Sequence, residues 1–182
     1  NAIQARLDSG ISTVYLPPPA DHYLISRTLK IHSNQSLVLD RFTRIRLAPK
    51  SDCLMICNAD PDKGNRNIAI LGGIWDMDNR SQSPNPIMTQ LEQGPQFYQP
   101  GRYLGICLRM LNVENLTIRS LTFRDPVTFC TQLAKLRHFT VEDILFDYQH
   151  FNPIAANMDG IHLDGDCRFG RIANLKGATN DD

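Results

Sequence analysis

The sequence predicts an all-β fold, a solenoid of short stacked strands, from three observations. Short β-rich runs follow one another from Thr13 onward, and no helix of useful length separates them. Three segments resemble one another, and a looser fourth copy follows them; they cover residues 67–74, 115–123, 138–146 and 171–175. Within each copy the apolar residues alternate, slip by one position and then alternate again.

The first ten residues predict a short helix before the strands begin. Ile3 and Leu7 are four positions apart, as on one face of a helix, and Gly10 is a typical stop. We expect this helix to cap the N-terminal end of the stack, because an uncapped end would expose apolar core and strand edges.

The strand runs are bounded by Pro, Asp, Asn or Ser, which are typical of turns. They cover residues 13–16, 23–25, 36–39, 44–47 and 53–56. In the repeats, Ile118 and Val141 are 23 positions apart, Val141 and Ile172 are 31 apart, and Ile70 and Ile118 are 48 apart. One period near 23 with insertions explains all three separations, and we interpret each slip of the alternation as a bend between two strands.

We expect residues 1–182 to form a single β-helix domain. The stretch 77–102 is rich in Pro and Gly and lacks strand periodicity, so it is predicted to be a long loop, either the wall of a binding groove or an insertion with no role. The ending Asn180-Asp181-Asp182 lacks a polar or flexible tail, and we expect the domain to be truncated there.

Composition excludes several classes of protein. The 19 basic and 19 acidic side chains balance, only 21% of residues are charged, and no block of like charge stands out, so no nucleic acid or membrane partner is expected. No apolar run reaches the ~20 residues of a membrane span, and the N-terminus has no signal-peptide pattern. The five cysteines lack zinc-site spacing, and we expect neither a metal nor a cofactor.

Three carboxylates are the candidates for catalysis. Asp159 precedes Asp181 and Asp182 by about one period, so the three can converge on one surface. Two such carboxyl groups, one protonated and one ionised, are the minimum for glycoside hydrolysis. Alternatively these residues are turns, or the ligands of a calcium ion.

Groove residues follow from the same alternation. His162 and Asp164 are expected to point outward together, beside Arg109 and Gln132 on neighbouring strands, with Cys107 and Cys130 outward as well. Arg109 could bind the carboxylate of an acidic sugar or pair with a surface acid. Asp159 shares the inward face, so we expect a bend or bulge at Gly160. Cys107 and Cys130 could form a disulfide, but we expect free thiols.

At these residues the chain resembles the pectin-lyase-like right-handed parallel β-helix superfamily, specifically glycoside hydrolase family 28, the polygalacturonase family. The resemblance covers nearly the whole chain, including Leu71-Gly72-Gly73-Ile74-Trp75-Asp76, and its specific motif is Asn157-Met158-Asp159-Gly160, similar to Asn-Thr-Asp-Gly, followed by the paired aspartates. The chain departs from the family at Met158, at Asn180 and in the spacing to the pair. The family's downstream Gly-His-Gly and Arg-Ile-Lys motifs are absent.

The resemblance implies a right-handed parallel β-helix and an inverting hydrolase of acidic, pectin-like polysaccharide such as galacturonan. By the motif match, Asp181 is the general acid, while Asp159 and Asp182 hold the attacking water. The partners would be the polysaccharide and further C-terminal β-helix coils of the same protein, and the location secreted or periplasmic. The alternatives are a polysaccharide lyase, which takes a proton beside the uronate carboxylate, and a non-catalytic carbohydrate-binding or structural β-helix.

Overall fold

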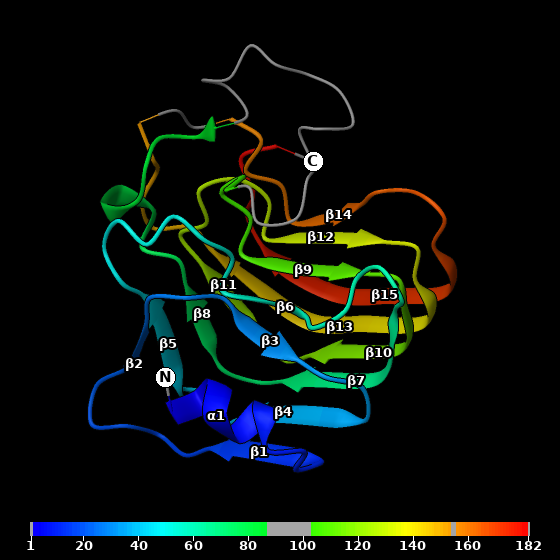
Figure 1. The fold of residues 1–182 in the computed structure, drawn as a ribbon. Coiled ribbons are helices and arrows are strands. Elements are labelled where there is room, and N and C mark those ends of the chain that lie inside the picture. The colour runs from blue at the N-terminus through cyan, green and yellow to red at the C-terminus, as the bar shows by residue number, and fades with distance from the viewer. Residues whose placement is uncertain (1, 87–102, 154–155, 182) are drawn as a thin grey trace.

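Strands are the main regular secondary structure of the computed structural model, which describes residues 2–86, 103–153 and 156–181 (Figure 1). The first elements are α1 (Ala2–Asp8), β1 (Thr13–Leu16), β2 (Tyr23–Ile25), β3 (Leu29–Ile31), β4 (Gln35–Leu39), β5 (Arg44–Leu47), β6 (Ile56–Asn58), β7 (Asn65–Leu71), β8 (Ile74–Asp76) and the 3-10 turn η1 (Asn79–Ser81). They are followed by β9 (Leu108–Leu111), β10 (Val113–Arg119), β11 (Thr122–Arg124), β12 (Thr131–Ala134), β13 (Arg137–Asp147), β14 (Ile161–Leu163) and β15 (Arg168–Gly177).

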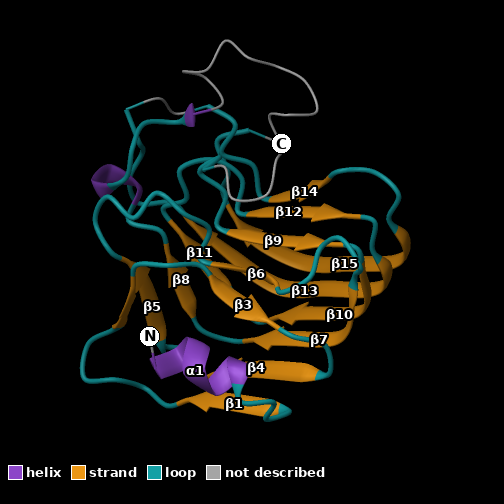
Figure 2. Ribbon diagram, in the orientation of Figure 1, coloured by secondary structure: helices purple, strands orange, loops and turns teal. Residues whose placement is uncertain are grey.

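These strands form two parallel sheets. The large sheet has ten strands in the order β1-β4-β7-β10-β13-β11-β8-β5-β2, with β15 paired along β13. The small sheet has five strands in the order β14-β12-β9-β6-β3. Together they form a half-barrel, and α1 lies at the β1 end of it (Figure 2).

The predicted right-handed parallel β-helix solenoid is therefore wrong. We expected each slip of the alternation to end one strand and start another, and this is what happens between β7 and β8 and between β10 and β11. An exception is β13, which runs unbroken for 11 residues and pairs with β10 along its first part and with β11 along its last part. Asp143, in its middle, has a φ of 57°, a left-handed conformation that Asp tolerates better than most residues. The strand bends there without ending, so the strands before and after the bend belong to one curved sheet.

The repeat that predicted the strands is confirmed. Ile118 pairs in register with Ile70 on one side and Val141 on the other, and Val141 pairs with Ile172. Parallel pairing places each apolar residue over its counterpart on the next strand, and Ile70, Ile118 and Val141 are fully buried. The strand expected at 53–56 instead begins at Ile56.

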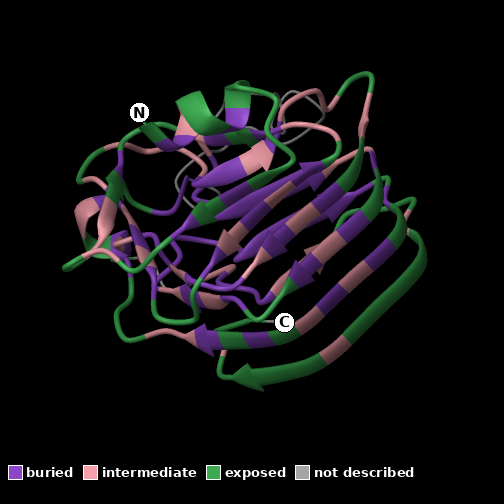
Figure 3. Cartoon of the chain, turned by 90° about the horizontal axis from the view of Figure 1, so that it is seen from below, coloured by how far each residue is buried: buried purple, intermediate pink, exposed green. Residues whose placement is uncertain are grey.

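The hydrophobic core lies between the sheets. Ile3 and Leu7 of α1 close it at one end, as expected. At the opposite edge β15 is mostly exposed, with Ile172 at 38% and Leu175 at 42% (Figure 3). In the described part of the chain, no helix has both the length and the apolar character needed to cross a membrane.

Left-handed residues make the bends of the large sheet. Four of them, Gly72, Ser120, Asp143 and Asn174, follow register-matched residues of β7, β10, β13 and β15 and so stack over one another. A second column of left-handed residues, Asn34, Asn67 and Asn115, lies near the N-terminal ends of β4, β7 and β10 in the same sheet. Their side chains form an asparagine ladder. Asn115 Nδ2 donates to Asn67 Oδ1 at 2.9 Å, and Asn67 Nδ2 donates to Asn34 Oδ1 at 2.7 Å.

Gly72 offers a direct test of the bend, because its φ is 77° and an added Cβ would lie 2.1 Å from the Leu39 carbonyl oxygen. Gly10 is a matched control with a φ of 78° and open space around it. We expect Gly72→Ala to lower the free energy of unfolding by about 3 kcal/mol, from conformational strain plus the clash. Gly10→Ala should cost only about 1 kcal/mol. Urea unfolding measures both; equal losses would contradict the close packing at the bend.

Candidate active site

The outer row of the small sheet brings together most of the residues predicted to bind substrate. In-register pairing aligns its members along β3, β6, β9, β12 and β14. They are Lys30, Cys57, Arg109, Gln132 and His162. The predicted adjacency of Arg109, Gln132 and His162 is therefore confirmed.

Their predicted exposure is wrong. Arg109 is 4% exposed and Gln132 is 2% exposed, so of these three residues only His162, with 33% of its side chain exposed, offers substantial surface. Cys107 and Cys130 do not face outward but belong to the core. The physical reason is a change of face just before β9 and β12, because Cys107 and the next residue, Leu108, are both buried in the same core cluster.

Because of this change of face, the side chain of Phe129 lies beside His162, where we expected a polar groove residue. Its ring stacks on the imidazole of His162, with centroids 4.3 Å apart and planes 5° from parallel. Behind it, Leu104 and Ile106 form a second, small apolar cluster. Stacking on one side fixes the orientation of the imidazole and leaves its edges for polar contacts.

Asp159 contacts one of those edges. His162 Nδ1 lies 3.1 Å from Asp159 Oδ2, and the aspartate side chain is only 9% exposed. The strand β14 begins at Ile161, so Asp159 precedes the strand, but it does not escape burial as expected, because the whole residue is only 7% exposed. Its backbone oxygen accepts hydrogen bonds from the Cys130 amide at 3.0 Å and the Tyr148 hydroxyl at 2.9 Å.

The later aspartate arrives at the same loop. Asp181 Oδ2 accepts a hydrogen bond from the Asn157 amide at 3.2 Å, and the Asn180 amide donates to the Met158 oxygen at 3.3 Å. The chain thus returns beside the Asn157-Met158-Asp159 segment, as the spacing predicted. Asp182 lies outside the described residues.

Asp164 lies at the other end of β14. It is exposed, and its Oδ2 accepts a hydrogen bond from Gln132 Nε2 at 3.0 Å, so Asp164 and His162 both neighbour Gln132. The Oε1 atom of Gln132 is buried and has no hydrogen-bond partner within the described ranges. A buried acceptor without a partner is costly, and such groups are candidates for contacts with a ligand.

Asparagines tie together the loops beside this site. Asn79 Nδ2 donates to the backbone oxygens of Pro126 at 3.0 Å and His150 at 2.8 Å. Asn152 Oδ1 accepts from the Asn85 amide at 3.0 Å. The stretch predicted as a long loop, 77–102, thus starts as a buried, bonded segment, and its residues 87–102 lie outside the described part of the structure.

Sequence reasoning missed Phe129 and Tyr148. Strict alternation through Thr131 and Leu133 would place Phe129 on the inward face, and nothing in that pattern indicates the change of face before β12. Tyr148 follows β13 in a loop and has no periodic signal. Its hydroxyl lies 2.8 Å from Cys130 Sγ, and so links the core to the backbone of Asp159.

Burial controls the ionisation of this inner layer. It raises the pKa of Tyr148, and it also raises the pKa of the Cys107 and Cys130 thiols. All five cysteines are free, as expected. The two core thiols are therefore protonated, unreactive packing groups in the native state.

The comparisons with known proteins bear on the fold. No family model matches the chain, and no curated protein matches its sequence. A candidate glycosyl hydrolase from Parabacteroides merdae ATCC 43184 has a similar structure, with a TM-score of 0.62 and 15% identity over 96% of this chain and 86% of that one. PfbA, a surface adhesin of Streptococcus pneumoniae, gives a TM-score of 0.53 and 18% identity over 82% of this chain and 35% of the adhesin. At these identities the likeness shows a shared fold alone.

Gln132 and Gln35 form a matched pair of buried glutamines that separates a structural role from a functional one. Gln35 makes three hydrogen bonds, to the Leu7 and Ile11 oxygens and from the His32 amide. We expect Gln35→Leu to lower the free energy of unfolding by about 2–3 kcal/mol, since those groups lose their partners. Gln132→Leu should change it by less than about 1 kcal/mol. Thermal or urea unfolding compares them, and a large loss in Gln132→Leu would make Gln132 a structural residue.

The corrected position of the cysteines is also testable. At about pH 8 we expect iodoacetamide to modify the partly exposed Cys167 while Cys107 and Cys130 stay unmodified until the protein is unfolded, because burial excludes the reagent and the raised pKa suppresses the thiolate. Peptide mass spectrometry assigns each adduct. If Cys107 were labelled as fast as Cys167, the burial of Cys107 would be contradicted and the predicted outward-facing position would be favoured.

Proposed function

We propose that the protein is a glycoside hydrolase that cleaves an acidic polysaccharide with inversion of configuration, at the loop where Asp159 and Asp181 meet. The observation that carries this proposal is the return of the chain at Asp181 to the Asn157-Met158-Asp159 segment. This return places Asp181 beside the segment that carries Asp159, and it supports the proposal that the two carboxyl groups act on one glycosidic bond.

The two carboxyl groups have different surroundings. Asp181 is exposed and accepts a hydrogen bond from a backbone amide, and its exposure lets it reach the leaving-group oxygen of a bound chain. Asp159 is buried beside His162, whose ring Phe129 holds in place, and this suits a carboxylate that orients an attacking water. Asp182 completes the proposed set, next to Asp181 in sequence.

The acidic class of substrate is supported by charge along the outer row. Lys30 and Arg109 share this row with His162, and no acidic residue occupies any of its five positions. Arg109 is buried, so it acts on an anionic chain through its positive potential more than by direct contact. Galacturonan is the polysaccharide that the family resemblance favours, and we propose a location outside the cell, secreted or periplasmic.

A second candidate function is binding of a glycan without cleavage. It is favoured by the hydrogen bonds of the acids, since Asp181 caps the Asn157 amide and Asp164 accepts from Gln132, as structural turn residues would. The shared fold with a surface adhesin is consistent with this function.

A digest of galacturonan by the protein separates these functions. We expect new reducing ends without ultraviolet absorbance from unsaturated sugars, and we expect Asp181→Asn and Asp159→Asn each to lower the rate by about 10²- to 10⁴-fold, the usual worth of a general acid or base. Asp166→Asn is the control, because Asp166 is exposed on the far side of β14 and its left-handed φ of 52° suits Asn. Unsaturated products would establish a lyase. Binding without any product would establish the second candidate function.

A further inference from the structure

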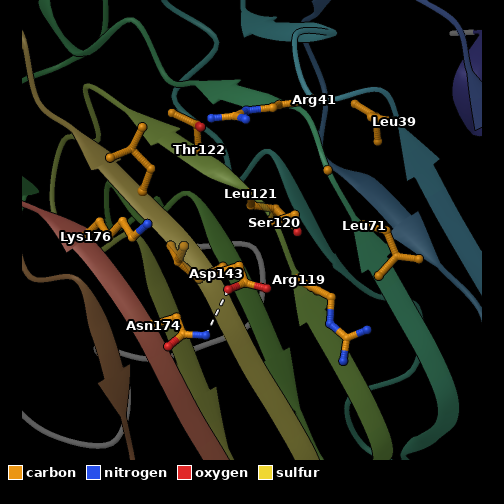
Figure 4. A pocket seen from close by; sticks show the side chains of 13 residues that line it. Leu39, Arg41, Leu71, Arg119, Ser120, Leu121, Thr122, Asp143, Asn174 and Lys176 are labelled. Atoms are coloured by element: carbon orange, nitrogen blue, oxygen red, sulfur yellow. Dashed lines mark hydrogen bonds between the residues drawn. The ribbon is translucent and has the colours of Figure 1, made fainter.

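We propose a second glycan-binding site, for an anionic oligosaccharide, in the groove outside the bend of the large sheet. This groove has a volume of about 540 Å³, and its floor follows the left-handed column Gly72, Ser120, Asp143 and Asn174 (Figure 4). It lies on the large sheet, whereas Asp159 and His162 belong to the small-sheet end of the molecule, so it does not depend on the proposed hydrolysis.

The groove runs across several strands of the large sheet. Its lining extends from Leu39, at the end of β4, to Asn174 and Lys176 of β15, across the intervening strands. Neighbouring strands are spaced by about 4.8 Å, a step close to the length of one sugar residue. A linear chain lying across the strands could therefore place about one sugar residue over each strand.

Charge selects an anionic ligand. Arg41, Arg119 and Lys176 line the groove, against the single carboxylate of Asp143. Arg119 is already paired with Glu142, but Arg41 and Lys176 form no ion pair with any described residue. Figure 4 shows the Arg41 side chain reaching toward Thr122 across one end of the groove, with Lys176 on the opposite side.

In a neighbouring row of the same sheet the cations are paired. This row consists of Arg46, Asp76, Arg124 and Asp147, aligned in register on β5, β8, β11 and β13. Arg46 Nη1 lies 3.3 Å from Asp76 Oδ2, and Arg124 Nη2 lies 2.6 Å from Asp147 Oδ2. This row alternates in sign and neutralises itself. In the groove, by contrast, the exposed side chains of Arg41 and Lys176 form no ion pair with a described residue, and the Arg41 guanidinium contacts the Phe42 ring, 5.5 Å from its centroid; such cations attract an anion.

The remaining lining favours a sugar over a nucleic acid. Ser120, Thr122 and Asn174 offer hydroxyl and amide groups for hydrogen bonds, and Leu145, 39% exposed, offers an apolar surface for the C–H face of a ring. No aromatic side chain is among the residues that line the groove in the described structure, so bases would have no platform for stacking.

The test uses a short oligogalacturonate and its methyl ester, which has the same backbone without the charge. Binding is followed by chemical shifts of the amides, with Ser120, Thr122 and Asn174 reporting the groove and His162 reporting the candidate active site. We expect the acid form to shift the groove amides, the methyl ester to bind at least about tenfold more weakly, and binding to weaken with salt.

Two double variants test whether binding depends on the charges of the groove and not on the net charge of the protein. Arg41→Gln/Lys176→Gln should lower affinity by about tenfold or more, since each removes a charged hydrogen-bond donor. Arg6→Gln/Lys63→Gln removes the same charge from exposed positions elsewhere and should leave affinity within about twofold. Asp159→Asn should still bind at the groove even if hydrolysis is lost. Equal binding of the methyl ester, unchanged groove amides, tighter binding of oligothymidylate, or equal losses in the two double variants would each overturn the proposal.

Discussion

Parallel register is the constraint on which the rest of the structure depends. Each strand hydrogen-bonds to the strand that precedes it in its sheet, so every bend must fall at the same level in each pass of the chain. Left-handed residues satisfy this requirement, because they turn the backbone within one residue and let the ladder resume. The stacked column Gly72, Ser120, Asp143 and Asn174 shows the result: one column of unusual backbone conformations shapes the curved sheet, the core behind it and the groove in front of it.

The sequence was most informative where apolar residues recur at a regular spacing. Ile70, Ile118, Val141 and Ile172 were identified as equivalent from spacing alone, and the structure places them in register. At the bends the prediction was right for β7 and β8 and for β10 and β11, but alternation of side chains cannot distinguish a strand that ends from one that bends and continues, as β13 does at Asp143. The solenoid was inferred from these slips together with the repeat, and the half-barrel of two sheets corrects it.

The candidate site shows the same division. Adjacency followed from the register, so Arg109, Gln132 and His162 were correctly placed together. Exposure did not follow, because a change of face before β9 and β12 buries Cys107 and Cys130 and brings Phe129 against His162. The hydrogen bonds from Tyr148 and among the loop asparagines join residues far apart in sequence that share no period, so one sequence gives no signal for them.

The central claim is that Asp159 and Asp181 act as a pair in an inverting hydrolysis. The anomeric configuration of the first product tests it most directly, by proton NMR during the early turnover of an α-linked galacturonan. The account predicts that the β-anomer appears first and then mutarotates, since water attacks the face opposite the leaving group. An α-anomer formed first would mean a retaining mechanism with a different arrangement of carboxylates, and the absence of any new anomeric signal would contradict hydrolysis at this site.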